Sequence, residues 1–194
     1  SFTENEVGKT PVAYIAAWQG TRDVAFLSAL LNADIRVKFN EFPFEVEGKS
    51  FPAGSLMITK GGNEYVPDFD QKMVEIANKF GVTLATTMSG YVDKGKDFGS
   101  PNIRVLQAPK VALIGGEGTN PLNYGAIWHF FEQELNYPLS NLETGNMSRY
   151  DLGKYDVIIM PSTRGNALSE SSQKSLMEWV RGGGKLIAID GALN

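Results

Sequence analysis

The sequence predicts an α/β protein with an open, doubly wound and mostly parallel sheet, preceded by a smaller α/β unit that ends before residue 108. Short apolar runs suited to buried strands alternate with amphipathic stretches at the helical repeat, and this alternation is typical of βαβ units. Glycine or proline stands at most of the junctions between them. With 194 residues, of which 42% are hydrophobic, the chain can bury one large core or two small ones.

In the first half, the predicted boundaries rest on capping residues. A helix begins at Thr21, a good N-cap residue, and Asp23 lies in its first turn, where the helix dipole favours an acidic side chain. A second helix opens at Pro67 and stops at Gly81. The remaining elements are strands over 12–18, 35–39, 55–59, 82–87 and 103–107, and a hairpin that turns near Gly48 and Lys49.

The second half repeats the alternation with longer apolar strands. Its predicted elements are a strand over 110–116, a helix over 123–136 with Asn123 as N-cap, a strand within 154–160, a helix within 169–184 and a strand within 185–190. Between the halves, residues 89–102 combine three glycines and a proline with mixed charges, as a long loop or linker does. We therefore expect two domains, 1–107 and 108–194, the second one truncated at its last turn.

Composition excludes several classes of function. The net charge of −4 argues against a nucleic-acid partner, because phosphate neutralisation needs clustered lysine and arginine. No apolar run reaches the roughly 18 residues that a membrane-spanning helix needs. The chain has no cysteine and a single histidine, His129, so we expect no disulfide, no metal site and no cofactor.

The glycine-rich turn GGEGTNP, at 115–121, is the first candidate for a ligand site. It follows a strand and precedes a helix, which is where α/β proteins bind ligands, because helix-end N–H groups point into the crevice. The spacing is neither GxGxxG nor a Walker A motif, and Glu117 repels a phosphate placed there. The alternatives are a site for an anion or a small polar ligand, and a turn in which the glycines have only a structural role. The candidate residues here are Gly115, Gly116, Glu117, Gly118 and Thr119.

A second candidate loop, PSTRG at 161–165, follows the next buried strand. Ser162, Thr163 and Arg164 supply its polar groups, and the guanidinium can clamp a carboxylate. The competing interpretation is an exposed loop arginine without a ligand.

The last strand delivers the backbone into a sharp turn at Ile189, Asp190 and Gly191. In α/β enzymes with a nucleophile elbow, a catalytic side chain stands on such a strand-to-helix turn. An aspartate acts as a nucleophile only with an acid–base partner and an electrophilic environment. The competing interpretation of Asp190 is a turn residue at the end of a truncated strand, and we then expect no catalytic residue in this chain.

Two other groups have simple structural explanations. His129 lies within a helix beside an apolar stretch, where a lone histidine is usually packed or partly solvated. Asp68 and Asp70 resemble a pair of ligands for a divalent metal, but acidic residues in the first turn of a helix account for them fully.

The order of the segments in the second half resembles a class I glutamine amidotransferase-like domain, whose sheet is flavodoxin-like. The resemblance is carried by IGGEGTNPLNYGAIWHFFEQELNYPL, KYDVIIMPS and GGGKLIAIDGAL. More specifically, the chain is similar to the C-terminal extension of bacterial, Bacteroidetes-type secreted zinc carboxypeptidases of the metallocarboxypeptidase family. The segment that joins the peptidase domain to that extension resembles AYIAAWQGTRDVAFLSALLNADIRVKF followed by PFEVEGKSFPAGSLMITKGGN, so the resemblance covers most of residues 11–194.

This resemblance implies a module without catalytic residues. The family holds its zinc with an HxxE…H set in an upstream domain, and no HxxE occurs in this sequence. Asp190 stands where an amidotransferase has its cysteine, and no histidine–glutamate pair follows it. The loop at 161–165 corresponds to one that supplies an oxyanion-hole N–H, but here polar residues replace most of its small ones.

The leading hypothesis is therefore a secreted or periplasmic accessory domain that packs against the peptidase domain of the same parent chain or positions its substrate. The alternative is a binding module with a pocket between the loops 115–121 and 161–165, which takes a small polar ligand or peptide. A third hypothesis, a hydrolase that uses Asp190 or Ser162, requires His129 within hydrogen-bond reach of one of them.

Overall fold

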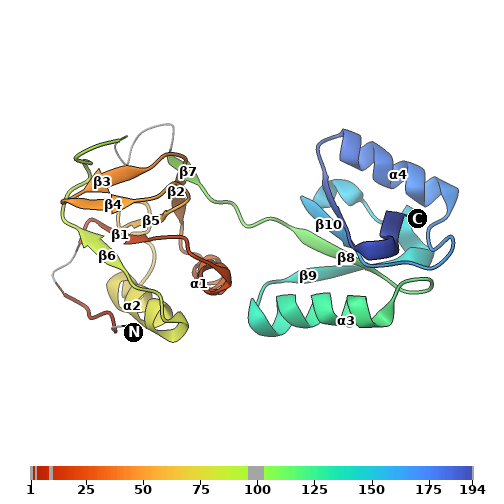
Figure 1. Cartoon of the computed structure of the whole chain (residues 1–194), viewed down its shortest axis with the longest axis horizontal. Coiled ribbons are helices and arrows are strands. Elements are labelled where there is room, and N and C mark those ends of the chain that lie inside the picture. The colour runs from red at the N-terminus through yellow and green to blue at the C-terminus, as the bar shows by residue number, and fades with distance from the viewer. Residues whose placement is uncertain (1, 3, 9–10, 96–102, 194) are drawn as a thin grey trace. The chain divides into compact units, whose positions relative to one another are not determined.

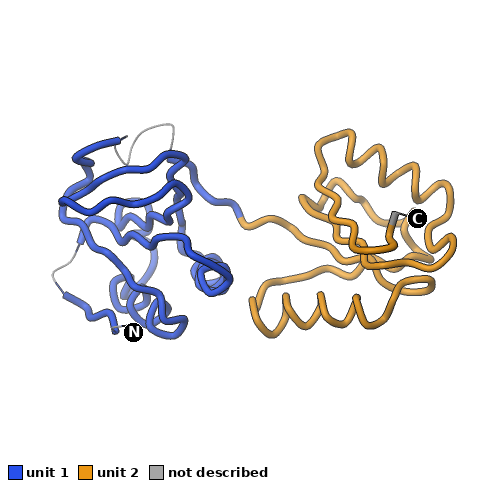
Figure 2. The backbone as a smooth tube through the Cα atoms, in the orientation of Figure 1, with its two compact units in different colours: residues 1–107 blue, residues 108–194 orange. Residues whose placement is uncertain are grey.

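The computed structural model of the chain describes residues 2, 4–8, 11–95 and 103–193, and the chain divides into two compact units, residues 1–107 and 108–194 (Figure 2). Each unit has its own sheet and its own buried apolar clusters. In the part of the chain that the structure describes, no helix is both long enough and apolar enough to cross a membrane.

Unit 1 contains a five-stranded sheet, two helices and a separate hairpin (Figure 1). The strand order is β6–β1–β5–β2–β7, and every neighbouring pair is antiparallel. The elements are β1 (Ala13–Ala16), α1 (Thr21–Asn32), β2 (Lys38–Asn40), β3 (Phe44–Val46), β4 (Lys49–Phe51), β5 (Leu56–Thr59), α2 (Phe69–Phe80), β6 (Ala85–Thr87) and β7 (Ile103–Val105).

The two faces of this sheet are covered differently. Tyr14 and Ile58 point to the face on which α1 and α2 pack, with Phe26 of α1 fully buried against them. Ile15 and Met57 point to the other face, which the β3–β4 hairpin covers. Because successive strand residues alternate between faces, each strand contributes to both layers.

The antiparallel pairing corrects the expectation of parallel βαβ units in this half. Strand–helix alternation shows where elements occur. Strand direction depends on whether each connection re-enters the sheet at the same end of the strands or crosses over to the other end, and periodicity does not encode this. The hairpin prediction is confirmed, with a two-residue turn at Glu47 (φ 49°) and Gly48 (φ 71°). A loop was expected over 89–102, of which residues 96–102 lie outside the described residues. Within the described part, Lys94 forms an antiparallel β-bridge with Glu45 of β3.

The predicted start of α1 at Thr21 is confirmed, whereas its predicted N-cap and the predicted start of α2 are wrong. The N-cap of α1 is Gly20 rather than Thr21, because the Asp23 carboxylate reaches back and accepts the backbone N–H groups of Gln19 (2.6 Å) and Gly20 (2.7 Å). The helix α2 begins at Phe69, after Asp68 at φ 51°, and Pro67 lies outside it. Its predicted stop at Gly81 is confirmed by a left-handed C-cap, φ 62°.

A buried polar cluster links β1 to α2. The Tyr14 hydroxyl donates to Asp70 Oδ1 at 3.0 Å, and Lys60 Nζ lies 2.7 Å from Asp70 Oδ2. These contacts occupy both oxygens of Asp70, so the suggested metal pair with Asp68 is not formed. In the described residues, no group of three or more potential metal ligands occurs.

This cluster predicts a loss of stability at alkaline pH. Burial, together with the hydrogen bond to Asp70 and its charge, raises the pKa of Tyr14 well above the ordinary value of 10.0. The unfolded chain releases the Tyr14 proton near its ordinary pKa while the folded chain retains it, so stability is present below about pH 10 and is lost above it. Denaturant unfolding at increasing pH should show this slope, and Tyr14→Phe should reduce it. Equal slopes in both proteins would contradict this role of Tyr14.

Unit 2 is a four-stranded sheet in which all neighbouring pairs are parallel, in the order β11–β10–β8–β9 (Figure 1). This confirms an α/β protein with a parallel sheet in this half. The elements are β8 (Val111–Gly115), α3 (Pro121–His129), a π-helical turn (Phe130–Glu134), β9 (Leu139–Glu143), β10 (Val157–Met160), α4 (Glu170–Arg181), β11 (Lys185–Ala188) and 3₁₀ turns at Thr144–Arg149, Leu152–Lys154 and Asp190–Leu193.

Helices cover both faces of this sheet. Leu176 of α4 packs on the face that contains Ile114 and Ile158, and α3 packs on the face that contains Leu113 and Ile159. The predicted N-cap Asn123 is wrong: α3 begins at Pro121, and Asn120 caps it by accepting from the N–H groups of Leu122 (2.9 Å) and Asn123 (3.2 Å). The strand β9 was not predicted.

Candidate functional site

The candidate loops of unit 2 meet at one edge of the sheet. Since all four strands are parallel, the loops that follow them leave from their shared carboxyl edge, where α/β proteins bind ligands. Thr119 and Thr163 form a β-bridge, and the backbone N–H of Asn120 donates to the Ser162 carbonyl at 2.8 Å. The N–H of Arg164 donates to the Gly118 carbonyl at 2.8 Å. The structure therefore brings the loops 115–121 and 161–165 together through backbone pairing.

Two glycines allow this close approach. A Cβ at Gly118 would lie 2.7 Å from Ala167 Cβ, and the residue has φ +83°. A Cβ at Gly115 would lie 2.5 Å from Tyr124 Cε2 and 2.9 Å from Asn141 Oδ1. Both glycines therefore have a packing role at this edge that accounts for their presence without a ligand.

The polar side chains around Gly115 and Gly116 bond mainly to one another and to the backbone. Tyr124 Oη donates to Asn141 Oδ1 at 3.2 Å, and burial followed by the charge of Glu143 raises the Tyr124 pKa. Thr144 Oγ1 donates to the Glu117 carbonyl at 3.0 Å, which ties the loop after β8 to the turn after β9. Asn141, Glu143 and Thr144 were missed from the sequence because β9 was missed.

A small hollow of about 370 Å³ lies outside the paired loops. Residues 118–122 line it together with Arg164, whose exposed side chain makes no ion pair with any described residue. The first N–H groups of α3, at Leu122 and Asn123, already bond to the Asn120 side chain. A ligand here would therefore depend on Arg164 rather than on the helix terminus.

Asp190 occupies the turn after β11 and is exposed, with φ +52°. The backbone N–H of Ile189 donates to the Met160 carbonyl at 3.0 Å, so the chain stays paired with β10 up to Ile189.

His129 is the last of the nine residues of α3. At a rise of about 1.5 Å per residue, it lies roughly 13 Å along the helix axis from Asn120, the N-cap. Among the described residues, His129 forms no hydrogen bond with Asp190 or Ser162, so the pairing that the third hypothesis requires is not formed.

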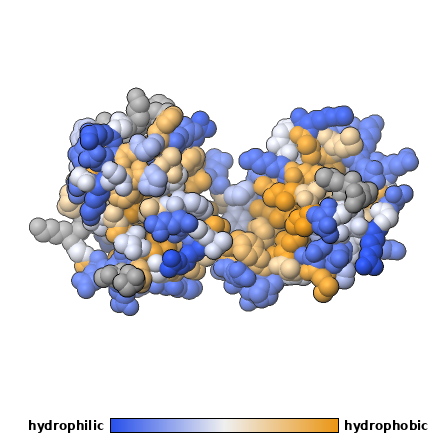
Figure 3. All heavy atoms as spheres, viewed as in Figure 1, coloured by the Kyte–Doolittle hydropathy of each residue, from blue (hydrophilic) through white to orange (hydrophobic). Residues whose placement is uncertain are grey.

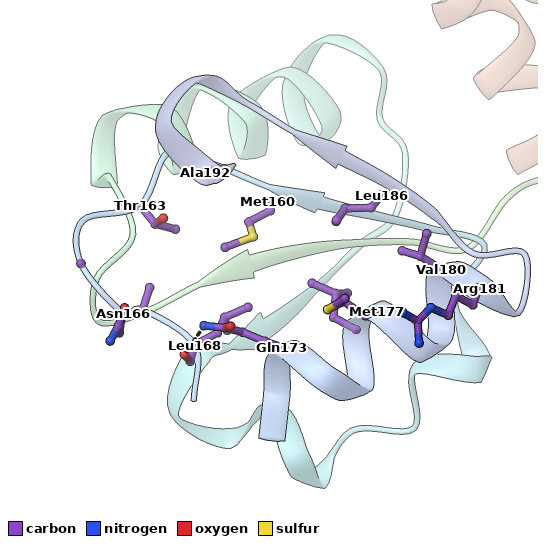
Figure 4. A pocket seen from close by; sticks show the side chains of 13 residues that line it. Met160, Thr163, Asn166, Leu168, Gln173, Met177, Val180, Arg181, Leu186 and Ala192 are labelled. Atoms are coloured by element: carbon purple, nitrogen blue, oxygen red, sulfur yellow. Dashed lines mark hydrogen bonds between the residues drawn. The ribbon is translucent and has the colours of Figure 1, made fainter. Parts of the chain in front are cut away.

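An apolar groove that the sequence analysis did not identify lies between α4 and the strands β10 and β11. Its volume is about 610 Å³. Met160 and Leu186 point into it from the sheet, and Met177 and Val180 point into it from α4 (Figure 4). Met177 is 55% exposed and Val180 is 39% exposed, so the groove is open to solvent.

Polar groups mark the two ends of this groove. Arg181 lies at one end, and the loop residues Thr163 and Asn166 lie at the other (Figure 4). Gln173 Nε2 donates to the Leu168 carbonyl at 3.0 Å and fixes this loop to α4. Of the residues predicted from the sequence, Thr163 lines the groove.

The edge strand β11 has a further exposed apolar side chain, on the face of the sheet opposite the groove. Among the described strands, β11 is hydrogen-bonded to β10 alone, and its Ile187 is 49% exposed on the face opposite Leu186. Figure 3 shows apolar side chains gathered on the visible face of unit 2. An open strand edge beside an apolar groove is a common template for protein association.

Comparison with protein-family models, curated proteins and solved structures gives no significant match to this chain.

Proposed function

We propose that this chain is a non-catalytic accessory domain of a secreted zinc carboxypeptidase-like protein, which packs against the peptidase domain of its parent chain or positions substrate for it. The observation that carries this proposal is the open apolar groove between α4 and β11. Exposed Met177 and Val180 line it, beside the strand β11, which among the described strands pairs with β10 alone. Apolar side chains that are exposed in a contiguous patch are stabilised by a protein partner that removes them from water.

Sheet topology supports the finer part of this proposal, a flavodoxin-like module of the amidotransferase type. If the four strands of unit 2 are numbered in chain order, the sheet order β9–β8–β10–β11 becomes 2–1–3–4. This corresponds to the first four strands of the flavodoxin-like order 2-1-3-4-5. The positive φ of Asp190, directly after the last parallel strand, also suits an elbow turn.

Hydrolysis assays test this function. The proposal expects no turnover of N-acylated peptides with a free C-terminus by this chain alone, with or without zinc. It expects turnover by the peptidase domain encoded in the same reading frame and a change in that turnover when the two are combined. Turnover by this chain alone that His129→Ala abolishes would contradict the proposal, as would a reading frame without a peptidase domain.

A second candidate function is a small-ligand binding module. The observation that favours it is the hollow of about 370 Å³, because residues of both candidate loops line it and Arg164 has no ion-pair partner there among the described residues. A carboxylate or another small anion suits such a site. A thermal-shift screen with amino acids, short peptides and small anions distinguishes the two functions, since only the binding module gives a saturable shift that Arg164→Gln removes.

A further inference from the structure

We propose that unit 1 binds an organic carboxylate with an apolar substituent, in the cavity between the start of α1, the strand β4 and the start of β6. The cavity has a volume of about 750 Å³, which lies within the range of about 300–1,000 Å³ that is typical of small-molecule sites. This inference is independent of the function proposed for unit 2, since every residue that carries it belongs to unit 1.

Two cationic side chains line the cavity from different elements. Arg22 lies in the first turn of α1, and Lys49 begins β4. Neither forms an ion pair or side-chain hydrogen bond with any described residue. The Arg22 guanidinium lies beside Gly81, where a Cβ would make an ordinary van der Waals contact with Nη1 at 3.5 Å.

The acidic residue of the lining, Asp23, does not neutralise both cations. It is 7% exposed, and its Oδ2 already accepts from the N–H groups of Gln19 and Gly20. With two cations and one carboxylate held by the backbone, the cavity keeps a net positive charge. An anion that enters it replaces water around the cations with charge-assisted hydrogen bonds.

The rest of the lining determines which anion fits best. Phe51 and Leu84 supply apolar surface, and Ser50 and Thr83 add hydroxyl groups to the lining. A highly hydrated phosphate gains nothing from an apolar wall, whereas the apolar part of an organic acid is removed from water there. The planar guanidinium of Arg22 matches a carboxylate, which it can bind through two parallel N–H donors.

The test compares N-acetyl-leucine with its uncharged amide on the full chain, by titration calorimetry and by amide chemical shifts. We expect saturable binding of the acid, with shifts centred on Gly20, Ser50 and Gly81, and binding of the amide weaker by about tenfold, which corresponds to about 1.4 kcal/mol. A third probe, N-acetyl-alanyl-leucine, distinguishes the source of the carboxylate: tighter binding than N-acetyl-leucine identifies a peptide C-terminus, and weaker binding identifies a free acylated amino acid.

Variants assign the site to the two cations. Arg22→Gln and Lys49→Gln should each weaken binding of N-acetyl-leucine by about tenfold. The matched control, Lys72→Gln, removes a lysine of α2 outside the cavity and should leave binding unchanged. Equal affinity for acid and amide, no binding of either, or shifts caused by inorganic phosphate but not by the acid would each overturn the proposal. None of these outcomes bears on hydrolysis or on the groove of unit 2.

Discussion

Replacing Gly118 with alanine should destabilise unit 2 by about 2–5 kcal/mol. The backbone there has φ +83°, a conformation that costs an L-residue about 1–2 kcal/mol. The added Cβ would lie 2.7 Å from Ala167 Cβ and 3.0 Å from Ala167 Cα, and overpacking of this kind typically costs about 1–3 kcal/mol. The shift needed to relieve the contact also separates the loops that the Asn120–Ser162 and Arg164–Gly118 hydrogen bonds hold together.

The matched control for this substitution is Gly125→Ala in α3. Nothing lies within 4 Å of a Cβ at Gly125, and alanine in a helix interior is favoured over glycine by about 1 kcal/mol. Denaturant-dependent amide exchange of β8 and β10 reports the stability of unit 2 separately from that of unit 1. Gly118→Ala with unchanged exchange would show that the two loops are not held as tightly as the structure indicates.

The double substitution Met177→Asp and Val180→Asp should strongly weaken docking of the proposed peptidase domain. It places two carboxylates in an apolar groove, and burying them against a partner without counter-charges is strongly unfavourable. Both side chains are already exposed, at 55% and 39%, so the fold should persist. Titration calorimetry against the peptidase domain should show affinity reduced by about 100-fold, which is the scale expected for residues at the centre of an interface.

Ser171→Asp with Ser175→Asp is the matched control for the groove. These residues also lie on α4 and are exposed, they add the same charge, and they do not line the groove. The control should therefore bind the peptidase domain as the unchanged chain does. Equal losses of affinity in the two double variants would show that charge on α4 in general causes the effect, and would contradict the groove as the docking surface.

Two central strands of unit 2 could be located from the sequence, although their parallel direction is not encoded in their periodicity. The strands at 111–115 and 157–160 are apolar on both faces, as strands buried between two helical layers must be. The strand β9 (Leu139–Glu143) could not be found in this way, because serine, asparagine and glutamate occupy three of its five positions. Its place at the sheet edge, where side chains reach solvent, permits that composition.

The sites themselves depend on contacts that sequence periodicity does not contain. The groove exists because Gln173, Met177 and Val180, spaced as i, i+4 and i+7, form a stripe of α4 next to the one that packs on the sheet. That spacing was visible in the sequence. An apolar stripe on a helix, however, predicts packing in the core unless it is known which elements face the stripe. The cavity of unit 1 is lined by both Arg22 and Lys49, which lie on different elements. Their proximity could not be predicted, because the strand order of unit 1 could not be predicted.

Hydrogen exchange of this chain, measured with and without the proposed peptidase domain, locates the docking surface. If the groove is that surface, exchange slows on binding in α4, in β11 and in the loop 161–168, and does not change in the control helix α2. Protection that is absent from α4 and β11, or that falls elsewhere in the chain, would contradict the assignment of the groove as the docking surface.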